Sequence, residues 1–223
     1  MQQSRARRQD ALRRMRLYLV TGERGDAQET VRIVTGALKG GVDVVQLRKK
    51  QLDRKELVEI GRELRAVTHD FGALFIVNDQ AEVAIECDAD GVHLGQEDGA
   101  IDMARAMAGF EDRLIGRSTH SLDQALGAEA EGADYLGVGP VFATPTKPGR
   151  PAVGTSLVGE VAASIRIPFV AIGGIDASNA ADVVSSGAKA IAVVRAIYDA
   201  VNPEEAARSI RTQMDARLEA GVV

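Results

Sequence analysis

The chain has 223 residues, of which 45% are hydrophobic, and carries a formal net charge of −5. This length and composition suffice for one sizeable core, and a single α/β barrel fits within them. The acidic balance argues against general nucleic-acid binding and a basic membrane-binding surface, and no apolar run reaches the roughly 18 residues of a membrane span.

The N-terminal segment is rich in arginine and has no apolar stretch, so it is not a secretory signal. Its cations are Arg5, Arg7, Arg8, Arg13, Arg14 and Arg16. We expect residues 1–15 to form a solvated basic helix or extension, with residues 16–223 as the catalytic domain. The alternative for the first segment is an amphipathic targeting presequence.

Beyond this segment, short β-branched runs alternate with helix-patterned segments. The predicted strands are residues 16–20, 42–48, 73–78, 91–95, 114–119, 135–142, 169–174 and 190–197. Two of the helices are expected at residues 26–39 and 53–69. The second opens with Asp53 as N-cap and Glu56 three residues later, which is the arrangement of a capping box.

Strands that alternate with helices imply parallel pairing, and eight such units close naturally into a (β/α)8 TIM barrel in a single domain. The alternative is an open doubly wound sheet, which usually carries a Gly-rich dinucleotide turn after its first strand. Residues 21–25 lack that pattern. In a barrel the chemistry lies at the carboxyl ends of the strands, so polar residues at those ends are the candidates for a functional site.

The single cysteine, Cys87, excludes an intrachain disulfide and a cysteine-based metal cluster. We interpret it as a buried structural thiol in a reducing compartment. These observations together predict a cytoplasmic protein that binds small molecules and neither nucleic acid nor membrane.

The second strand ends in Gln46-Leu47-Arg48-Lys49-Lys50. Because side chains alternate along a strand, Gln46, Arg48 and Lys50 share one side. A charge inside a strand is costly unless it is paired. An anionic ligand would satisfy Arg48, and a salt bridge to a neighbouring strand is the alternative.

The third strand ends in Asn78-Asp79, and Asp98 follows the fourth strand. Adjacent strand ends bring Asp79 and Asp98 towards each other. Two carboxylates beside several cations suit Mg²⁺, which prefers oxygen ligands and often bridges to substrate phosphates. Taken singly, Asp79 reads as a helix N-cap and Asp98 as a loop cap, but their joint placement favours a metal site.

The fifth strand ends in Ser118-Thr119-His120. Ser118 either donates a hydrogen bond to a ligand or caps the helix that starts near Ser121. We interpret His93 as a barrel histidine whose hydrogen bonds are satisfied, rather than as a catalyst. His120 is interpreted as a helix-entry residue.

The last three strand exits carry features of phosphate sites. The loop after the sixth strand has the hydroxyls of Thr144 and Thr146 followed by Lys147, and the alternative is an ordinary surface turn. Backbone amides after the seventh and eighth strands, near Gly174, Val194 and Arg195, form the usual barrel phosphate site. The alternative for the glycines is close packing of helix and strand.

The polar residues therefore separate into two predicted anion sites. One combines Arg48, Lys50, Asp79, Asp98 and Lys147 with a metal and suits a diphosphate. The other combines Gly174, Val194 and Arg195 and suits a monophosphate, with Thr144 and Thr146 able to touch a ring between the two. This division predicts a two-substrate transferase with diphosphate as the leaving group.

These motifs, in this order, resemble those of the thiamine-phosphate synthase family over about residues 17–198. The segments that carry the resemblance are residues 46–50, 78–79, 91–98, 139–147 and 172–175. The resemblance implies condensation of 4-amino-2-methyl-5-hydroxymethylpyrimidine diphosphate with thiazole phosphate, giving thiamine phosphate and diphosphate. It also implies Mg²⁺ as cofactor, held by Asp79 and Asp98.

The same resemblance implies roles for the remaining residues. Those expected to bind the pyrimidine diphosphate are Gln46, Leu47, Arg48, Lys49, Lys50, Asn78, Ser118 and Lys147. Those expected around the thiazole phosphate are Thr144, Pro145, Thr146, Gly174, Val194 and Arg195. Arg48, Lys50 and Lys147 are expected to be catalytic, because they stabilise the charge of the leaving group.

Two positions depart from the family pattern, since position 49 is commonly acidic and position 195 commonly serine. Arg195 either strengthens the phosphate site through a bidentate contact or crowds it. The alternative functions are a thiazole tautomerase-like isomerase, which needs no paired metal aspartates, and a non-catalytic barrel that senses a thiamine precursor.

Overall fold

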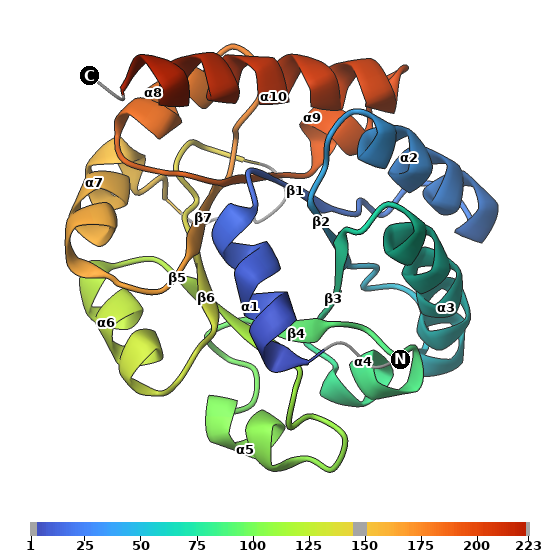
Figure 1. Cartoon of the computed structure of the whole chain (residues 1–223). Helices are drawn as coiled ribbons and strands as arrows, with labels where there is room; N and C mark the ends of the chain where they lie inside the picture. Colours follow the sequence, from blue (N-terminus) through green and yellow to red (C-terminus); the bar gives the residue numbers. More distant parts are fainter. Residues whose placement is uncertain (1–3, 145–150, 222–223) are drawn as a thin grey trace.

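The computed structural model describes residues 4–144 and 151–221. Within them, eight parallel strands close into a barrel in chain order with helices around it, so the predicted (β/α)8 barrel is confirmed (Figure 1). The strands are β1 (Leu17–Val20), β2 (Val44–Leu47), β3 (Leu74–Asn78), β4 (Gly91–Leu94), β5 (Leu114–Thr119), β6 (Tyr135–Val138), β7 (Phe169–Ile172) and β8 (Ile191–Val193). The helices are α1 (Arg5–Arg14), α2 (Ala27–Lys39), α3 (Arg54–Asp70), α4 (Ala81–Glu86), α5 (Ile101–Ala106), α6 (Leu122–Ala130), α7 (Gly154–Ser164), α8 (Ala180–Ser185), α9 (Arg195–Tyr198) and α10 (Pro203–Ala220).

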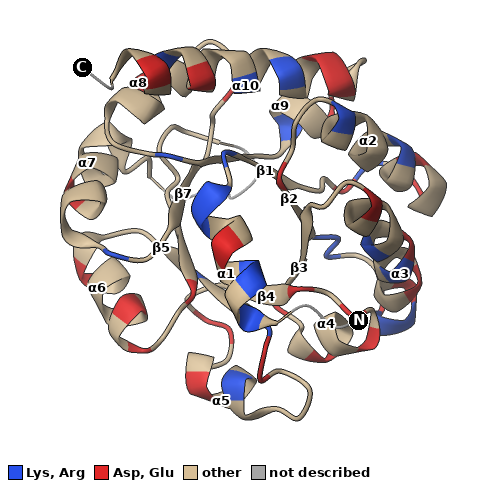
Figure 2. Cartoon of the chain, in the orientation of Figure 1, with Lys and Arg blue, Asp and Glu red and all other residues tan. Residues whose placement is uncertain are grey.

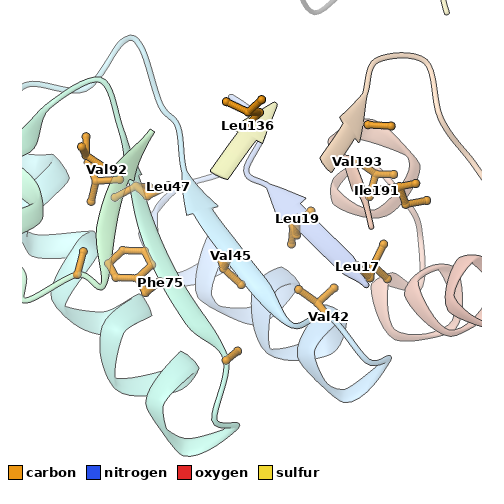
Figure 3. Packing of buried hydrophobic residues seen from close by; sticks show 14 of the residues in the cluster. Leu17, Leu19, Val42, Val45, Leu47, Phe75, Val92, Leu136, Ile191 and Val193 are labelled. Atoms are coloured by element: carbon orange, nitrogen blue, oxygen red, sulfur yellow. The ribbon is translucent and has the colours of Figure 1, made fainter. Parts of the chain in front are cut away.

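Every strand except β4 contributes to two hydrophobic layers, and β4 contributes to the outer one alone. In β2, Val45 and Leu47 pack in the layer between the barrel and its helices (Figure 3), whereas Val44 belongs to the layer inside the barrel. Strands buried on both faces read as continuous apolar runs, which explains why the β-branched pattern located them. β1 pairs with β8 in parallel, with Leu17 opposite Ile191, and this pairing closes the sheet.

The two helices predicted in detail begin at their expected caps. The Asp26 carboxylate accepts a hydrogen bond from the first turn of α2. At α3, Asp53 and Glu56 form the predicted capping box, in which each side chain accepts from the other residue's backbone N–H. These local signals need no tertiary partner, because each bond joins residues of one turn.

The last two strands end earlier than predicted. Gly173 and Gly174 follow β7 with φ values of 108° and 65°, a left-handed conformation that glycine adopts readily and that stops a strand. The expectation of strand up to residue 197 was wrong, because α9 starts at Arg195. Tyr198 at its end is fully buried, and its hydroxyl lies 2.8 Å from Thr30 Oγ1 on α2. Packing of Tyr198 against α2 therefore favours a helix over a strand for residues 195–198. β2 and β6 are also shorter than predicted.

The N-terminal helix forms as expected, but only one of its faces is solvated, where Arg7, Arg13 and Arg14 are exposed. α1 lies across the centre of the barrel in Figure 1, and Figure 2 shows basic residues along it. Leu12 and Met15 pack into the layer inside the barrel. Arg8 is fully buried, and its guanidinium donates to Asp90 Oδ1 at 2.9 Å and to the Asp112 carbonyl at 2.9 Å. Since both partners precede strands, α1 closes the mouth formed by the strands' amino ends.

Cys87 is buried, as expected for a structural thiol. In the described part of the chain, no helix is both long enough and apolar enough to cross a membrane. The cytoplasmic location expected from the sequence stays a prediction.

Arg8→Ala should lower the free energy of unfolding by about 3 kcal/mol, because it leaves Asp90 with an incompletely compensated buried charge. Arg13→Ala is the matched control in the same helix, since Arg13 pairs with Asp10 on the surface at 3.0 Å. The control should change stability by less than about 0.5 kcal/mol. Urea unfolding measures both, and equal losses would show that the buried pair is not what holds α1 in place.

Candidate active site

A cavity of about 480 Å³ opens at the carboxyl ends of the strands, on the mouth opposite α1. The predicted site residues in its wall are Gln46, Arg48, Asn78, Ser118, Thr144, Gly174, Val194 and Arg195. A second cavity of about 220 Å³ adjoins it, because Arg48 and Asn78 line both, and this cavity also takes in Lys50 and Asp79. One mouth of the barrel thus collects residues from both predicted anion sites.

The cations after β2 meet a carboxylate that sequence reasoning missed. The Arg48 side chain is 12% exposed, and its NH1 lies 3.4 Å from Glu23 Oε1. The backbone N–H of Lys50 donates to the same carboxylate at 3.1 Å. Glu23 belongs to the loop after β1. Arg48 therefore pairs with a loop residue, and not with a residue of a neighbouring strand as the alternative had it. Its position in a loop that follows a strand is the sequence feature that could have identified Glu23 as a site residue.

Leu47 and Lys49 do not line the larger cavity, but both contribute to the wall of the smaller one. Leu47 is buried in the layer that faces the helices. The Lys49 ammonium donates to the backbone carbonyls of Arg24 at 2.9 Å and Gly25 at 3.0 Å, and lies 5.8 Å from the centroid of the Tyr198 ring. Lys49 therefore anchors the loop that carries Glu23. Strand alternation explains this, because residues 47 and 49 point away from residues 46 and 48.

The two aspartates come together as their strand positions predict. Asp79 follows β3 with a φ of 64°, unusual for a residue other than glycine, and its N–H donates to the His93 carbonyl at 2.9 Å. Asp98 accepts from the Gly95 N–H at 2.6 Å, so it is also the loop cap that was considered. The N-cap alternative for Asp79 was wrong, because Gln80 occupies that position of α4.

The environment of Asp79 perturbs its ionisation. Burial and the neighbouring Asp98 carboxyl group raise the pKa of Asp79 to about 6, although the charges of Lys50 and Arg48 lower it. Two carboxylates and two cations thus act on one another at this edge of the barrel. A strongly shifted carboxyl group in a cavity wall is typical of functional sites.

The floor of the larger cavity is polar. His93 is hydrogen-bonded through both ring nitrogens, to Tyr135 OH at 3.1 Å and to Ser118 Oγ at 3.0 Å, which agrees with its interpretation as a satisfied barrel histidine. The capping alternative for Ser118 was wrong, because Ser121 caps α6. His120 lies at the entry of α6, where its N–H donates to Gln124 Oε1 at 2.8 Å.

The opposite side of the cavity is shaped by glycines. A Cβ on Gly174 would lie 2.7 Å from the Phe142 Cβ, so close packing of two loops requires glycine there. Arg195, the first residue of α9, is exposed and lines the cavity together with Asp176 and Asp199. Hydrogen bonds from Ser178 lower the pKa of Asp176, so this side of the cavity contains negative charge as well as the Arg195 cation.

Part of one predicted motif lies outside the described residues. Thr144 lines the larger cavity. Pro145, Thr146 and Lys147 fall in the segment 145–150, and their expected roles stay predictions.

Comparisons with known proteins agree with the motifs. A family model described as "Thiamine monophosphate synthase" matches residues 17–197. The chain is 46% identical over 202 residues to the thiamine-phosphate synthase of Thermus thermophilus, covering 89% of this chain and 97% of that one. It is 46% identical over 208 residues to the thiamine-phosphate synthase of a Nostoc species, covering 93% of this chain but 58% of that one. The chain thus spans little more than half the length of the Nostoc protein.

A solved structure described as thiamine phosphate pyrophosphorylase from Pyrococcus furiosus superposes with a TM-score of 0.84 at 38% sequence identity. The superposition covers 94% of this chain and 98% of that chain. The 3-hexulose-6-phosphate synthase structure, with 18% identity and a TM-score of 0.66, shares the fold alone.

Asp98→Asn should lower the pKa of Asp79 from about 6 towards its ordinary value of 3.8, because the neighbouring negative charge is removed. A raised folded-state pKa means that Asp79 protonation stabilises the fold at low pH, and that this contribution is lost as the pH rises through about 6. The variant should reduce that loss. Carboxyl ¹³C titration in metal-free buffer measures the pKa, with Asp102→Asn as an exposed control. An unchanged Asp79 pKa would contradict the proximity of the pair.

Glu23→Gln should tighten the binding of inorganic diphosphate about three- to fivefold, because Glu23 competes with an anion for Arg48 and the Lys50 N–H. The size follows from the modest free energy of a partly exposed ion pair. Isothermal calorimetry measures the dissociation constant. Glu29→Gln removes the same charge without contacting Arg48, and an equal gain in that control would make the effect one of net charge alone.

Proposed function

This chain belongs to the thiamine monophosphate synthase family, and we propose that it joins 4-amino-2-methyl-5-hydroxymethylpyrimidine diphosphate to a thiazole phosphate. The products are thiamine phosphate and diphosphate. The observation that carries this proposal is the convergence of Asp79, Asp98, Arg48 and Lys50 at one mouth of the barrel. The adjoining cavity of about 480 Å³ is of a size typical of small-molecule sites.

The aspartate pair fits a divalent cation such as Mg²⁺, whose preferred ligands are carboxylate oxygens. Asp79 has a raised pKa in spite of two nearby side-chain cations, so the pair has negative charge that a bound ion would compensate. No group of three or more His, Cys, Asp or Glu side chains able to hold a metal occurs in residues 4–144 and 151–221. The remaining ligands would then be diphosphate oxygens and water.

The proposed reaction breaks a C–O bond and forms a C–N bond. The electron pair of the C–O bond leaves with the diphosphate, and Arg48 and Lys50 compensate the negative charge that grows on it. Lys147 joins them in this proposal. Bound Mg²⁺ would supply further charge compensation to the same leaving group. The aminopyrimidine delocalises positive charge from its methylene carbon, and the thiazole nitrogen attacks that carbon, so a protein nucleophile is not required.

The thiazole phosphate is proposed to bind on the opposite side of the cavity, near Gly174, Val194 and Arg195. Arg195 lines that side together with Asp176 and Asp199, so its charge would offset their repulsion of a phosphate. This provides a physical reason for an arginine at a position where the family commonly has serine. Thr144 lies in the same wall and would contact the thiazole ring.

The test of the proposed function is a coupling assay that supplies both substrates and follows thiamine phosphate, with Mg²⁺ and with excess EDTA. Turnover that needs Mg²⁺ supports the proposal. Isomerisation of a thiazole phosphate without metal would favour the tautomerase-like alternative, and binding of a precursor without turnover would favour the sensing barrel.

Asp98→Asn should lower Mg²⁺-dependent kcat/KM by about 100-fold or more, because one of two charged metal ligands is lost. The asparagine oxygen can still accept from the Gly95 N–H, so the loop should keep its shape. Asp102→Asn, an exposed change in the following helix, should leave kcat/KM within about twofold. Wild-type kinetics in the Asp98 variant would remove Asp98 from the metal site.

A further inference from the structure

A chain of hydrogen bonds crosses the inside of the barrel beneath the larger cavity. Gln46 Nε2 donates to Tyr18 OH at 2.8 Å, and the hydroxyls of Tyr18 and Tyr135 lie 2.9 Å apart. Tyr135 OH lies 3.1 Å from His93 Nδ1, and His93 Nε2 lies 3.0 Å from Ser118 Oγ. Five different strands supply these residues. Gln46 and Ser118, at the two ends, line the cavity, whereas Tyr135 does not.

The phenol and imidazole in the middle are held in place by packing. Tyr135 is fully buried, and its ring centroid lies 5.4 Å from that of His93. A Cβ on Gly116 would lie 2.2 Å from Tyr135 Cζ and 2.5 Å from His93 Nδ1. A Cβ on Gly137 would lie 3.1 Å from His93 Cε1. Two glycines in neighbouring strands therefore leave a slot that these rings fill.

The donors and acceptors in this row of five hydrogen-bonded side chains can be counted. The Gln46 amide nitrogen only donates, so Tyr18 accepts there and its single hydrogen goes to Tyr135. Tyr135 in turn donates to Nδ1 of His93. A neutral imidazole that accepts at Nδ1 carries its proton on Nε2, so it donates to Ser118 Oγ. If every hydrogen bond from Ser118 to Tyr18 ran in the opposite direction, the Tyr18 hydrogen would have no acceptor among these five side chains. Burial raises the pKa of both tyrosines, which keeps their hydrogens available.

This direction determines what the cavity floor offers a ligand. The hydroxyl hydrogen of Ser118 is left to point into the cavity as a donor, and Gln46 Oε1 is left as an acceptor. A 4-aminopyrimidine has the complementary pattern, because its ring nitrogen accepts and its amino group donates. A 4-oxopyrimidine has the reverse pattern, since its ring N–H donates and its carbonyl accepts.

We propose that Tyr135 is a positioning residue that acts through His93 to keep Ser118 a hydrogen-bond donor, and that it thereby selects 4-amino over 4-oxo pyrimidine rings. The selection of substrate rests on the proposed function, whereas the protonation state of His93 does not. The two parts can therefore be tested separately.

The first test is ¹⁵N NMR of the histidine rings in the ligand-free protein at pH 8. The chain has three histidines, and His93→Gln identifies the signals of His93. The expected wild-type signature is an unprotonated Nδ1 and a protonated Nε2. Tyr135→Phe should convert this to a mixture or to the Nδ1-protonated form. A wild-type His93 with its proton on Nδ1 would overturn the proposal, whatever reaction the protein catalyses.

The second test compares kcat/KM for the 4-amino substrate and its 4-oxo analogue in the coupling assay. Tyr135→Phe should lower the preference for the 4-amino ring about tenfold or more, because Ser118 can then also accept. Tyr198→Phe is the matched control, a buried tyrosine bonded to Thr30 at 2.8 Å and outside the chain of five. An unchanged preference in Tyr135→Phe would overturn the selectivity role. Absence of turnover in the wild type would instead count against the proposed function and leave the NMR result to decide the role of Tyr135.

Discussion

The hydrogen bonding of β8 back to β1 is the constraint on which the rest of this molecule depends. A closed parallel sheet sends the carboxyl ends of its strands to one mouth and their amino ends to the other. Arg48, Asp79 and Asp98 follow three successive strands, whose parallel pairing places their carboxyl ends side by side. Asp98 and Arg48 therefore act on the ionisation of Asp79. The candidate site is therefore a product of the topology, and no single helix or loop contains it.

The two mouths use the same residue types in opposite ways. At the amino-end mouth, Arg8 pairs with Asp90 at 2.9 Å and Arg105 pairs with Asp134 at 2.6 Å, so those charges are compensated within the protein. At the other mouth, burial and a second carboxyl group raise the pKa of Asp79 to about 6. Charges compensated internally hold the fold together. Charges left partly uncompensated beside a cavity can act on a ligand.

The barrel interior links these two ends. Apolar side chains and α1 fill the lower part, whereas hydrogen-bonded polar groups form the floor of the cavity above it. The polar part persists because its buried groups are hydrogen-bonded to one another, and Gly116 and Gly137 leave room for the rings. The floor is therefore rigid and directional, which suits recognition of a flat heterocycle. The loops above it supply charges that suit phosphate groups.

The amino-acid sequence by itself determined the barrel, the start of α3 at its capping box, and the strand ends that hold polar residues, because periodicity and capping are local properties. Tertiary structure alone decided the burial of α1, the use of Lys49 as a loop anchor, and the partners of Glu23 and Tyr135. These contacts join residues far apart in the chain, such as Arg8 with Asp90 and Tyr18 with Tyr135. Alternation along a strand shows which side of the sheet a side chain faces. Only the closed barrel determines which residues it contacts on that side.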